Sequence, residues 1–238
     1  YPNPLEYQKV STICREEKIT LMIGTPVFFM GYLRKSEPGD FKTVRVAVVG
    51  ADKNPDWLRE AYKKEHDVDL YEGYGCTETS PVISVNTIQF NRPGSIGKPL
   101  TSVKVKIADI DTGEELPAGQ EGKILVKGDL VMKGYFDDLE ETSVRIKDGW
   151  YDTGDMGMLD KDGYLWHRGR LKRFVKIGGE MVSMVKVEHV LSEILTHDID
   201  CCVVEVPDFL KGAKIVATTT KPIDSKKILK LMANELPN

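Results

Sequence analysis

The sequence predicts an α/β protein in which part of a parallel sheet is followed by antiparallel strands and then by the start of a small α+β domain. Over the first seventy residues, helical patterns alternate with short apolar strands, the order of a doubly wound sheet with crossover helices. After about residue 95 the strands become short and are joined by turns, which is typical of an antiparallel sheet or barrel. After Arg170, helices and strands mix again.

The first helix is expected over Asn3–Glu17, because Leu5, Val10 and Ile13 fall on one helical face. A short buried strand is expected at Thr20–Ile23. The spacing of apolar residues therefore predicts that the chain begins with a helix followed by a strand.

Thr25 and Pro26 predict the start of the second helix, since a capping hydroxyl followed by proline is a preferred helix opening. Val44–Val49 is β-branched and apolar enough for a central parallel strand. A helix at Trp57–His66 and a strand at Val68–Tyr71 complete the alternation.

Short strands joined by turns are expected next, at Ser102–Ile107 and Gly122–Val126. Asp155–Leu159 and Tyr164–His167 flank Asp160–Gly163, a loop that ends in the Asp-Gly pair favoured by hairpins. This pattern indicates antiparallel pairing.

The third segment has the order strand, helix, two strands and helix. Its expected elements are a strand ending at Ile177, a turn at Gly178-Gly179, a helix over Ser183–Leu195, strands at Asp200–Val206 and Ala213–Thr219, and a helix from Asp224. We therefore expect three parts: residues 1–94 of an α/β sheet, a barrel-like 95–169, and 170–238 as the N-terminal part of a small domain.

Charge and hydropathy exclude several classes of partner. Thirty-three Lys and Arg against thirty-seven Asp and Glu give a net charge of −4, which does not support bulk attraction to nucleic acid. The most apolar stretch, Leu21–Leu33, is too short and too interrupted to span a bilayer. We expect neither a nucleic acid partner nor a transmembrane segment.

The four cysteines are too few and too scattered for a disulfide framework. No CxxC pair exists among Cys14, Cys76, Cys201 and Cys202, so neither a zinc site nor a redox motif is supported. We expect them to be small buried hydrophobic residues in a reducing, cytoplasmic setting.

The densest cluster of chemically active residues is Tyr71–Pro81, directly after a predicted buried strand, where ligands bind in open α/β sheets. Its two glycines let backbone amides approach a phosphate, Thr77 adds a hydroxyl, and Glu78 supplies a carboxylate oxygen suited to magnesium. Tyr74 offers a flat face to a base. Spacing alone leaves a second interpretation equally open, a glycine-rich turn with polar surface residues.

Two further clusters follow. In Gly149–Asp155, the carboxylate of Asp155 could accept hydrogen bonds from both hydroxyls of a ribose, although an isolated aspartate of this kind is more often a turn residue. Gly169–Lys176 holds four cations in seven residues, a pattern that by itself usually marks a solvated basic loop.

Together, in this order, the clusters resemble the adenylate-forming superfamily of acyl-CoA synthetases, nonribosomal-peptide adenylation domains and luciferases. Tyr74–Glu78 matches its signature of aromatic, Gly, any residue, Thr and Glu. The other matching segments are Gly122–Gly128 running on to Gly134-Tyr135, Tyr151–Asp155 as the ribose motif, and Gly169–Lys172 with Lys176 and Gly178-Gly179 as the crossover between large and small domains.

Within the superfamily, Glu72–Glu78 and Arg170–Ser183 are most similar to the acyl-acyl-carrier-protein synthetase half of bacterial 2-acylglycerophosphoethanolamine acyltransferases. The resemblance covers essentially the whole chain. It implies a fragment of the large adenylate-forming domain, with its parallel-sheet portion and β-barrel subdomain, followed by the start of the small mobile domain.

The resemblance also implies roles for individual residues. Tyr74 would stack on adenine, with Gly50, Ala51, Asp52 and Lys53 on the other side of the base. Together with Gly75, Thr77 would bind the α-phosphate, and Glu78 would bind Mg2+. Asp155 and Arg170 would hold the ribose hydroxyls.

Three further segments take implied roles. Lys172 stands at the hinge position about which the small domain rotates, and Gly178-Gly179 resembles the loop that lines the thiol tunnel. Thr25–Tyr32 resembles the segment lining the acyl pocket, but Phe28 and Phe29 are more simply interpreted as core residues.

The implied activity is that of an AMP-forming ligase using ATP and Mg2+ to activate a carboxylic acid, expected to be a fatty acid. The acceptor would be the thiol of coenzyme A or of the phosphopantetheine of an acyl carrier protein. In the acyltransferase subfamily the product feeds a membrane lysophospholipid, so association of the parent protein with a membrane is a hypothesis.

Two parts of the family pattern are missing, the upstream Ser/Thr/Gly-rich phosphate loop and the lysine near the family's C-terminus. We therefore expect a piece of a longer enzyme, with negligible adenylation activity by itself. A non-catalytic nucleotide-binding or interaction module that keeps the fold remains the alternative. No GxSxG elbow or HExxH pair points to another chemistry.

Overall fold

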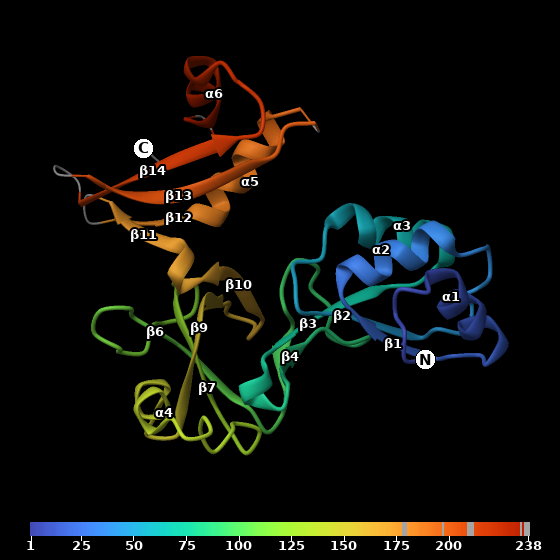
Figure 1. Cartoon of the computed structure of the whole chain (residues 1–238). Coiled ribbons are helices and arrows are strands. Elements are labelled where there is room, and N and C mark those ends of the chain that lie inside the picture. Colours follow the sequence, from blue (N-terminus) through green and yellow to red (C-terminus); the bar gives the residue numbers. More distant parts are fainter. Residues whose placement is uncertain (178–179, 197, 209–211, 234, 236–238) are drawn as a thin grey trace. The chain divides into compact units, whose positions relative to one another are not determined.

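The computed structural model describes residues 1–177, 180–196, 198–208, 212–233 and 235. The chain divides into two compact units (Figure 1). Unit 1 consists of Tyr1–Thr153 and Gly157–His167, and unit 2 of Gly154–Met156 and Arg168–Asn238. The predicted boundaries of three parts, near residues 95 and 170, remain a prediction.

Unit 1 begins with the predicted alternation of helices and strands. The elements are α1 (Tyr7–Glu16), β1 (Leu21–Gly24), α2 (Pro26–Lys35), β2 (Val46–Val49), α3 (Asp56–His66) and β3 (Leu70–Gly75). Strands β1, β2 and β3 are parallel neighbours, so the polypeptide leaves each of them at the same edge of the sheet. The sheet continues through β4 (Val82–Val85) and β5 (Lys98–Pro99), which pair antiparallel.

Helices α2 and α3 lie along one face of this sheet (Figure 1). Their contact is made by large buried side chains, among them Phe29 of α2 and Tyr62 of α3, both fully buried. The Tyr62 hydroxyl donates a hydrogen bond of 2.8 Å to the Phe29 carbonyl oxygen, which satisfies the only polar atom of that side chain. This core fixes the edge at which β2 and β3 end.

Two local predictions about the helices were wrong in detail. The first helix begins at Tyr7, not at Asn3. Thr25 does precede Pro26 at the start of α2, but its side chain makes no capping hydrogen bond. The start of α2 instead has a proline at its first helical position and a buried apolar face.

An antiparallel sheet follows along the chain, and all of it except Gly154–Met156 and residues 168–170 belongs to unit 1. Its strands are β6 (Lys104–Ala108), β7 (Gly122–Lys127), β8 (Ile146–Lys147), β9 (Trp150–Leu159) and β10 (Leu165–Arg170), in the order β10-β9-β7-β6 with β8 paired to β9. A short helix, α4 (Leu139–Arg145), precedes β8 and was not predicted. The core of this sheet includes the buried residues Ile107, Ile124 and Leu165.

Unit 2 holds the small α+β segment predicted after Arg170. Its elements are β11 (Phe174–Ile177), β12 (Glu180–Ser183), α5 (Met184–Ile194), β13 (Cys201–Asp208), β14 (Gly212–Thr219) and α6 (Ser225–Met232). Strand β12, which pairs with β11, was not predicted. The predicted turn at Gly178-Gly179 lies outside the described residues. Leu191 of α5 and Val203 of β13 are at the centre of its core.

The cysteines only partly follow the expectation of burial. Cys14 is buried, Cys76 and Cys201 are half-buried, and Cys202 is exposed, so the expectation was wrong for Cys202. Among the described residues, no helix is long and apolar enough to cross a membrane.

The expected order of a parallel-sheet portion, an antiparallel sheet and a small α+β segment is the order of elements in this chain. The predicted acyl-pocket segment belongs to α2. Phe29 is fully buried in the core, and Phe28 is half-buried against it, so the core interpretation of these residues was right.

Candidate functional site

The first half of the Tyr71–Pro81 cluster is strand, not loop. Strand β3 runs on through Tyr74 to Gly75, although the sequence predicted that it would end at Tyr71. The strand persists because β4 pairs with it antiparallel, with Tyr74 beside Ser84. The glycines of the cluster are therefore strand residues, and the turn begins only after Gly75.

Gly75 is required by packing. A Cβ atom at this position would lie 1.8 Å from the carbonyl oxygen of Pro81, far inside van der Waals contact. The chain can therefore fold back from the turn onto β3 only if residue 75 has no side chain. The sequence analysis assigned the glycines to the approach of a phosphate, whereas at Gly75 the close neighbour in the structure is the protein's own backbone.

The turn that follows is a short 3₁₀ helix, Thr77–Thr79, held by a buried hydroxyl. The backbone N–H of Cys76 donates to Oγ1 of Thr79 at 3.2 Å, and this hydroxyl donates to the Pro81 carbonyl oxygen at 2.9 Å. Sequence reasoning missed the role of Thr79. Thr77, in contrast, is exposed, which leaves its hydroxyl accessible to a ligand.

The Glu78 carboxylate is half-buried beside two tyrosines. The Tyr135 hydroxyl donates to it at 3.0 Å, and the backbone N–H of Met132 donates to the Glu78 carbonyl oxygen at 2.8 Å. Burial raises the pKa of Glu78, but hydrogen bonds from its own backbone N–H, Tyr135 and Tyr151 outweigh burial, so the pKa lies below its ordinary value. Glu78 is therefore ionised at neutral pH. Neither tyrosine was singled out from the sequence as a partner of Glu78.

An ionised carboxylate is a hard oxygen ligand of the kind that magnesium prefers. Among the described residues, no group of three or more His, Cys, Asp or Glu side chains could hold a metal ion. The donor set therefore fits a cation that takes one protein carboxylate and completes its coordination with phosphate oxygens and water, as Mg2+ commonly does.

Tyr74 presents a half-buried ring at the end of β3. The ring packs against that of His167, with centroids 5.7 Å apart and planes inclined by 42°. This contact fixes one face of the tyrosine, while apolar residues of the antiparallel core hold its body. The sequence had indicated no partner for His167.

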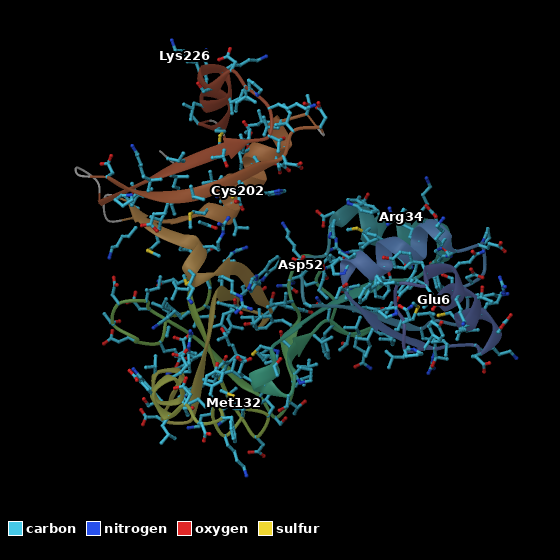
Figure 2. The ribbon with its side chains drawn as sticks, viewed as in Figure 1. Glu6, Arg34, Asp52, Met132, Cys202 and Lys226 are labelled. Carbon is cyan, nitrogen blue, oxygen red and sulfur yellow. The ribbon has the colours of Figure 1, made fainter. Side chains whose placement is uncertain are left out.

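The residues predicted to line the other side of the base follow β2. The Gly50 N–H donates to the Gly24 carbonyl oxygen at 3.0 Å, and a Cβ at Gly50 would stand 3.2 Å from the Gly73 carbonyl oxygen. Ala51 has a φ of +69° in the left-handed region, which turns the chain sharply away from the sheet. Ala51 and Asp52 are both exposed, and Asp52 is labelled in Figure 2.

A buried carboxylate that sequence reasoning missed lies directly before the motif. Glu72 is 6% exposed and forms an ion pair with Arg59 of α3. It also accepts hydrogen bonds from the Asn86 side chain at 3.5 Å and from the Gly94 N–H at 3.3 Å. An acidic residue within an apolar strand was the only sequence signal for this arrangement.

The contacts continue from Asn86 towards the β9–β10 hairpin. The side-chain Oδ1 of Asn86 accepts a hydrogen bond from the Arg92 backbone N–H at 2.9 Å. The Arg92 guanidinium forms ion pairs with Asp160 at 2.5 Å and Asp162 at 2.9 Å. Asp160 also accepts the indole N–H of Trp166 at 2.9 Å. A polar network thus joins α3, β3 and the hairpin loop, and we call it the Glu72 network.

In unit 2, Asp155 lies against Arg170. The sequence placed Asp155 between a turn and a strand, but it lies inside β9 and is only 2% exposed. Its Oδ1 is 3.1 Å from Nε of Arg170, whose side chain is 64% exposed. The pair combines a buried carboxylate with an accessible guanidinium.

The basic run after Gly169 divides into different environments. Arg173 forms an ion pair with Glu188 at 2.6 Å and donates to the Val203 carbonyl oxygen at 3.2 Å, so it binds the short 3₁₀ helix Leu171–Arg173 to the core of unit 2. Lys172, at the predicted hinge position, is exposed. The predicted thiol-tunnel loop, Gly178-Gly179, lies outside the described residues.

The chain is similar to known proteins over most of its length. The family model described as AMP-binding enzyme matches residues 2–136. A long-chain-fatty-acid–CoA ligase of Bacillus subtilis is 36% identical over 220 residues, which is 90% of this chain and 38% of that protein. 4-Coumarate–CoA ligase 3 of rice, Oryza sativa, is 34% identical over 83% of this chain and 37% of its own length.

Solved structures match across nearly the whole chain. ATP-bound MatB from Rhodopseudomonas palustris superposes with a TM-score of 0.82 at 27% identity, covering 99% of this chain and 47% of that one. The O-succinylbenzoate coenzyme A synthetase MenE of Bacillus subtilis gives a TM-score of 0.84 at 26% identity, covering 97% and 50%. The chain thus spans between about a third and a half of the length of these relatives.

Proposed function

This chain belongs to the AMP-binding enzyme family, and on that premise we propose that the whole protein is an ATP-dependent acid–thiol ligase that forms an acyl-adenylate. The observation that carries the proposal is the ionised Glu78 in a turn fixed directly after β3. Three of the relatives compared above support it, because they are named as CoA ligases or as a coenzyme A synthetase.

The proposed reaction has two steps. A carboxylate oxygen of the acid attacks the α-phosphorus of ATP, and the bond from that phosphorus to the pyrophosphate oxygen breaks, giving acyl-AMP and pyrophosphate. A thiol then loses its proton, its sulfur attacks the acyl carbon, and AMP leaves, giving a thioester. Charge concentrates on the phosphate oxygens in the first step, so fixed donors and cations must offset it.

We assign the nucleotide contacts as follows. Tyr74 takes one face of the adenine, and the backbone of Gly50, Ala51 and Asp52 lines the other. The exposed hydroxyl of Thr77, with the backbone after Gly75, binds the α-phosphate. Asp155 and Arg170 hold the ribose hydroxyls, and Lys172 is the hinge residue.

Glu78 is the proposed ligand for Mg2+. Bound there, the ion would neutralise charge on the phosphate oxygens. The chain's own part is to keep the carboxylate ionised and oriented, which the hydrogen bonds from Tyr135 and Tyr151 support. Tyr135 thus positions Glu78.

For the acid we propose a fatty acid, supported by the 36% identity to a long-chain-fatty-acid–CoA ligase. Several other relatives are named for aromatic acids, among them 3-hydroxybenzoate and indoleacetate, so aromatic acids are the competing class. For the thiol we propose coenzyme A or the phosphopantetheine of an acyl carrier protein. The likeness of Glu72–Glu78 and Arg170–Ser183 to acyltransferase-linked synthetases supports the carrier protein and a parent acting at a membrane.

Acid-dependent exchange between pyrophosphate and ATP tests the proposal on the whole protein. We expect exchange with a long-chain fatty acid to exceed exchange with indoleacetate or 4-coumarate. Glu78→Gln should lower the rate by about 10²–10³-fold, the usual effect of removing one group that offsets transition-state charge. Glu140→Gln, an exposed acid in the first turn of α4, serves as the matched control and should have no effect.

Exchange that Glu78→Gln leaves intact would refute the assignment of the metal ligand. No exchange with any acid, in a protein that still binds ATP, would support the non-catalytic module instead. None of the comparisons favours that module.

A further inference from the structure

Strands β6 and β7 present a strongly basic outer face in unit 1. Along β7 the residues alternate, with Ile124 and Val126 fully buried in the core and Leu125 and Lys127 on the opposite side. Along β6, Ile107 is buried, so Lys104 and Lys106 point away from that core. The outward side of this antiparallel pair is therefore largely lysine.

The pairing brings these lysines together around an indole. Lys104 stands directly opposite Lys127, and Lys147 of β8 stands opposite Trp150 of β9. The Nζ atoms of Lys106 and Lys127 lie 4.6 Å and 5.9 Å from the centre of the Trp150 ring. We call Lys104, Lys106, Lys127, Lys147 and Trp150 the lysine face.

These four lysines have no acidic partner. Among residues 1–177 and the other described ranges, none of them forms an ion pair, whereas Lys123, at the far end of the same face, pairs with Asp152 at 3.9 Å. Lys127 donates only to the Asp148 backbone carbonyl, at 2.8 Å.

Unpaired like charges on neighbouring strands carry a cost. Two lysines directly opposite each other destabilise an antiparallel pair. The chain has an excess of acids, with a net charge of −4, and it pairs many of its other cations, including Arg15, Arg92 and Lys63. In a chain with this charge balance, a cluster of lysines that forms no ion pair among the described residues points to an anionic partner.

We propose that the lysine face docks an acidic α-helix of a partner protein, and that this partner is the carrier protein that supplies the thiol. The identity of the partner rests on the proposed function. Lysines two apart on a strand are about 6.8 Å apart, and carboxylates at positions i and i+4 on a helix are about 6 Å apart. A helix with acids at that spacing can therefore face Lys104, Lys106 and Lys127 at once.

The geometry favours a protein over a lipid surface. The Trp150 ring is half-buried and has Lys106 above it, so it is not available to enter a bilayer. The face is a rigid antiparallel sheet and not an amphipathic helix, which is the usual form of a surface-binding membrane segment. Contacts between exposed charges at the edge of an interface chiefly raise the rate of association, and salt weakens them.

Calorimetric or surface-resonance binding of an acyl carrier protein that lacks its phosphopantetheine tests the docking surface independently of thioester chemistry. We expect the wild-type chain to bind it, with affinity falling severalfold between about 50 and 300 mM salt. The triple variant K104E/K106E/K127E should bind at least tenfold more weakly.

The matched control is K226E/K227E/K230E, which makes the same change in net charge on α6, where the three lysines are exposed (Lys226 is labelled in Figure 2). It should change affinity by less than twofold. The milder variant K104Q/K106Q/K127Q should show an intermediate loss of affinity. Both variants of the lysine face should still bind the adenylate analogue, which shows that a loss of carrier-protein binding is not caused by misfolding.

The proposal would be overturned if the carrier protein did not bind, or if the two charge-reversed triple variants weakened its binding equally. It would also be overturned if K104E/K106E/K127E still bound the carrier protein normally but no longer bound phosphatidylserine vesicles, because the lysine face would then be a lipid-binding surface. Failure of the proposed function would appear separately, as a wild-type chain that does not bind an acyl-adenylate analogue.

Discussion

The two groups of proposed nucleotide contacts are built in different ways. The group after β3 is fixed by the backbone and by buried polar bonds: Gly75 packs on Pro81, Thr79 ties the turn, and the Glu72 network holds the strand. The group in unit 2 consists of a buried carboxylate, Asp155, beside a largely exposed guanidinium, that of Arg170.

This difference separates what must be rigid from what must remain accessible. Groups that stabilise charge in a transition state work best when their position is fixed before the substrate arrives. A guanidinium that is 64% exposed can instead reach a ligand without breaking a packed core. Substitutions should therefore cost stability in the first group and ligand affinity in the second.

The largest expected effect is that of Gly75→Ala. The added Cβ would lie 1.8 Å from the Pro81 carbonyl oxygen, so the turn must move, and we expect a loss of about 3–5 kcal/mol in the free energy of unfolding. Gly113→Ala is the control, because its φ of +74° strains an alanine but no atom lies within 4 Å. It should cost about 1 kcal/mol. Urea unfolding measures both, and equal losses would refute the packing argument.

Glu72→Gln should cost about 3 kcal/mol, because it leaves the Arg59 guanidinium without its buried counter-charge. Asp56→Asn removes the other carboxylate that bonds Arg59, but Asp56 is 83% exposed, so that loss should stay below about 0.5 kcal/mol. Chemical denaturation of the two variants compares them. If Glu72→Gln were as mild as Asp56→Asn, the Glu72 network would not be what holds β3.

Arg170→Lys keeps a positive charge beside the buried Asp155 carboxylate and changes only an exposed side chain, so it should change the free energy of unfolding by less than about 1 kcal/mol. This is the expected signature of the accessible group. A loss as large as that of Glu72→Gln would remove the contrast between the two groups. Thermal melts of both variants under one set of conditions are sufficient.

The smallest effect is expected for Tyr135→Phe, which removes the 3.0 Å hydrogen bond to Glu78. The folded pKa of Glu78 lies below the 4.5 of an ordinary glutamate, so this bond stabilises the fold above about pH 4.5 and the benefit is lost as the pH falls through the lower folded pKa. We expect a loss of about 0.5 kcal/mol at pH 7 that becomes smaller as the pH falls below about 4.5. A loss independent of pH would contradict the role of Tyr135.

Most of the helices and strands could be predicted from the sequence, because they follow the local spacing of apolar residues. The alternation of apolar strands with helices predicted the start of α2 and, within two residues, the bounds of β2 and α3. The end of β3 was missed because pairing with β4, a long-range contact, extends the strand through Tyr74 and Gly75. Strand β12 was missed for the same kind of reason, since it exists by pairing with β11.

The candidate site divides in the same way. Thr77, Glu78 and Asp155 were found because their residue types and spacing carry chemistry. Their partners, such as Tyr135 and Arg59, come from segments far apart in the sequence, and no spacing rule connects them. Sequence reasoning thus singles out residues whose chemistry suits a ligand and misses the partners that hold those residues in place.

Calorimetric titration of this chain with a non-hydrolysable acyl-adenylate analogue tests the central claim most directly. Thr77→Val and Arg170→Lys change one exposed side chain in each group, and the lysine keeps a positive charge beside Asp155, so neither should disturb the fold. The account predicts one-to-one binding by the wild-type chain and at least a tenfold loss of affinity in each variant. Absence of binding, or binding that both substitutions leave unchanged, would contradict the claim that each of the two groups contributes to binding an acyl-adenylate.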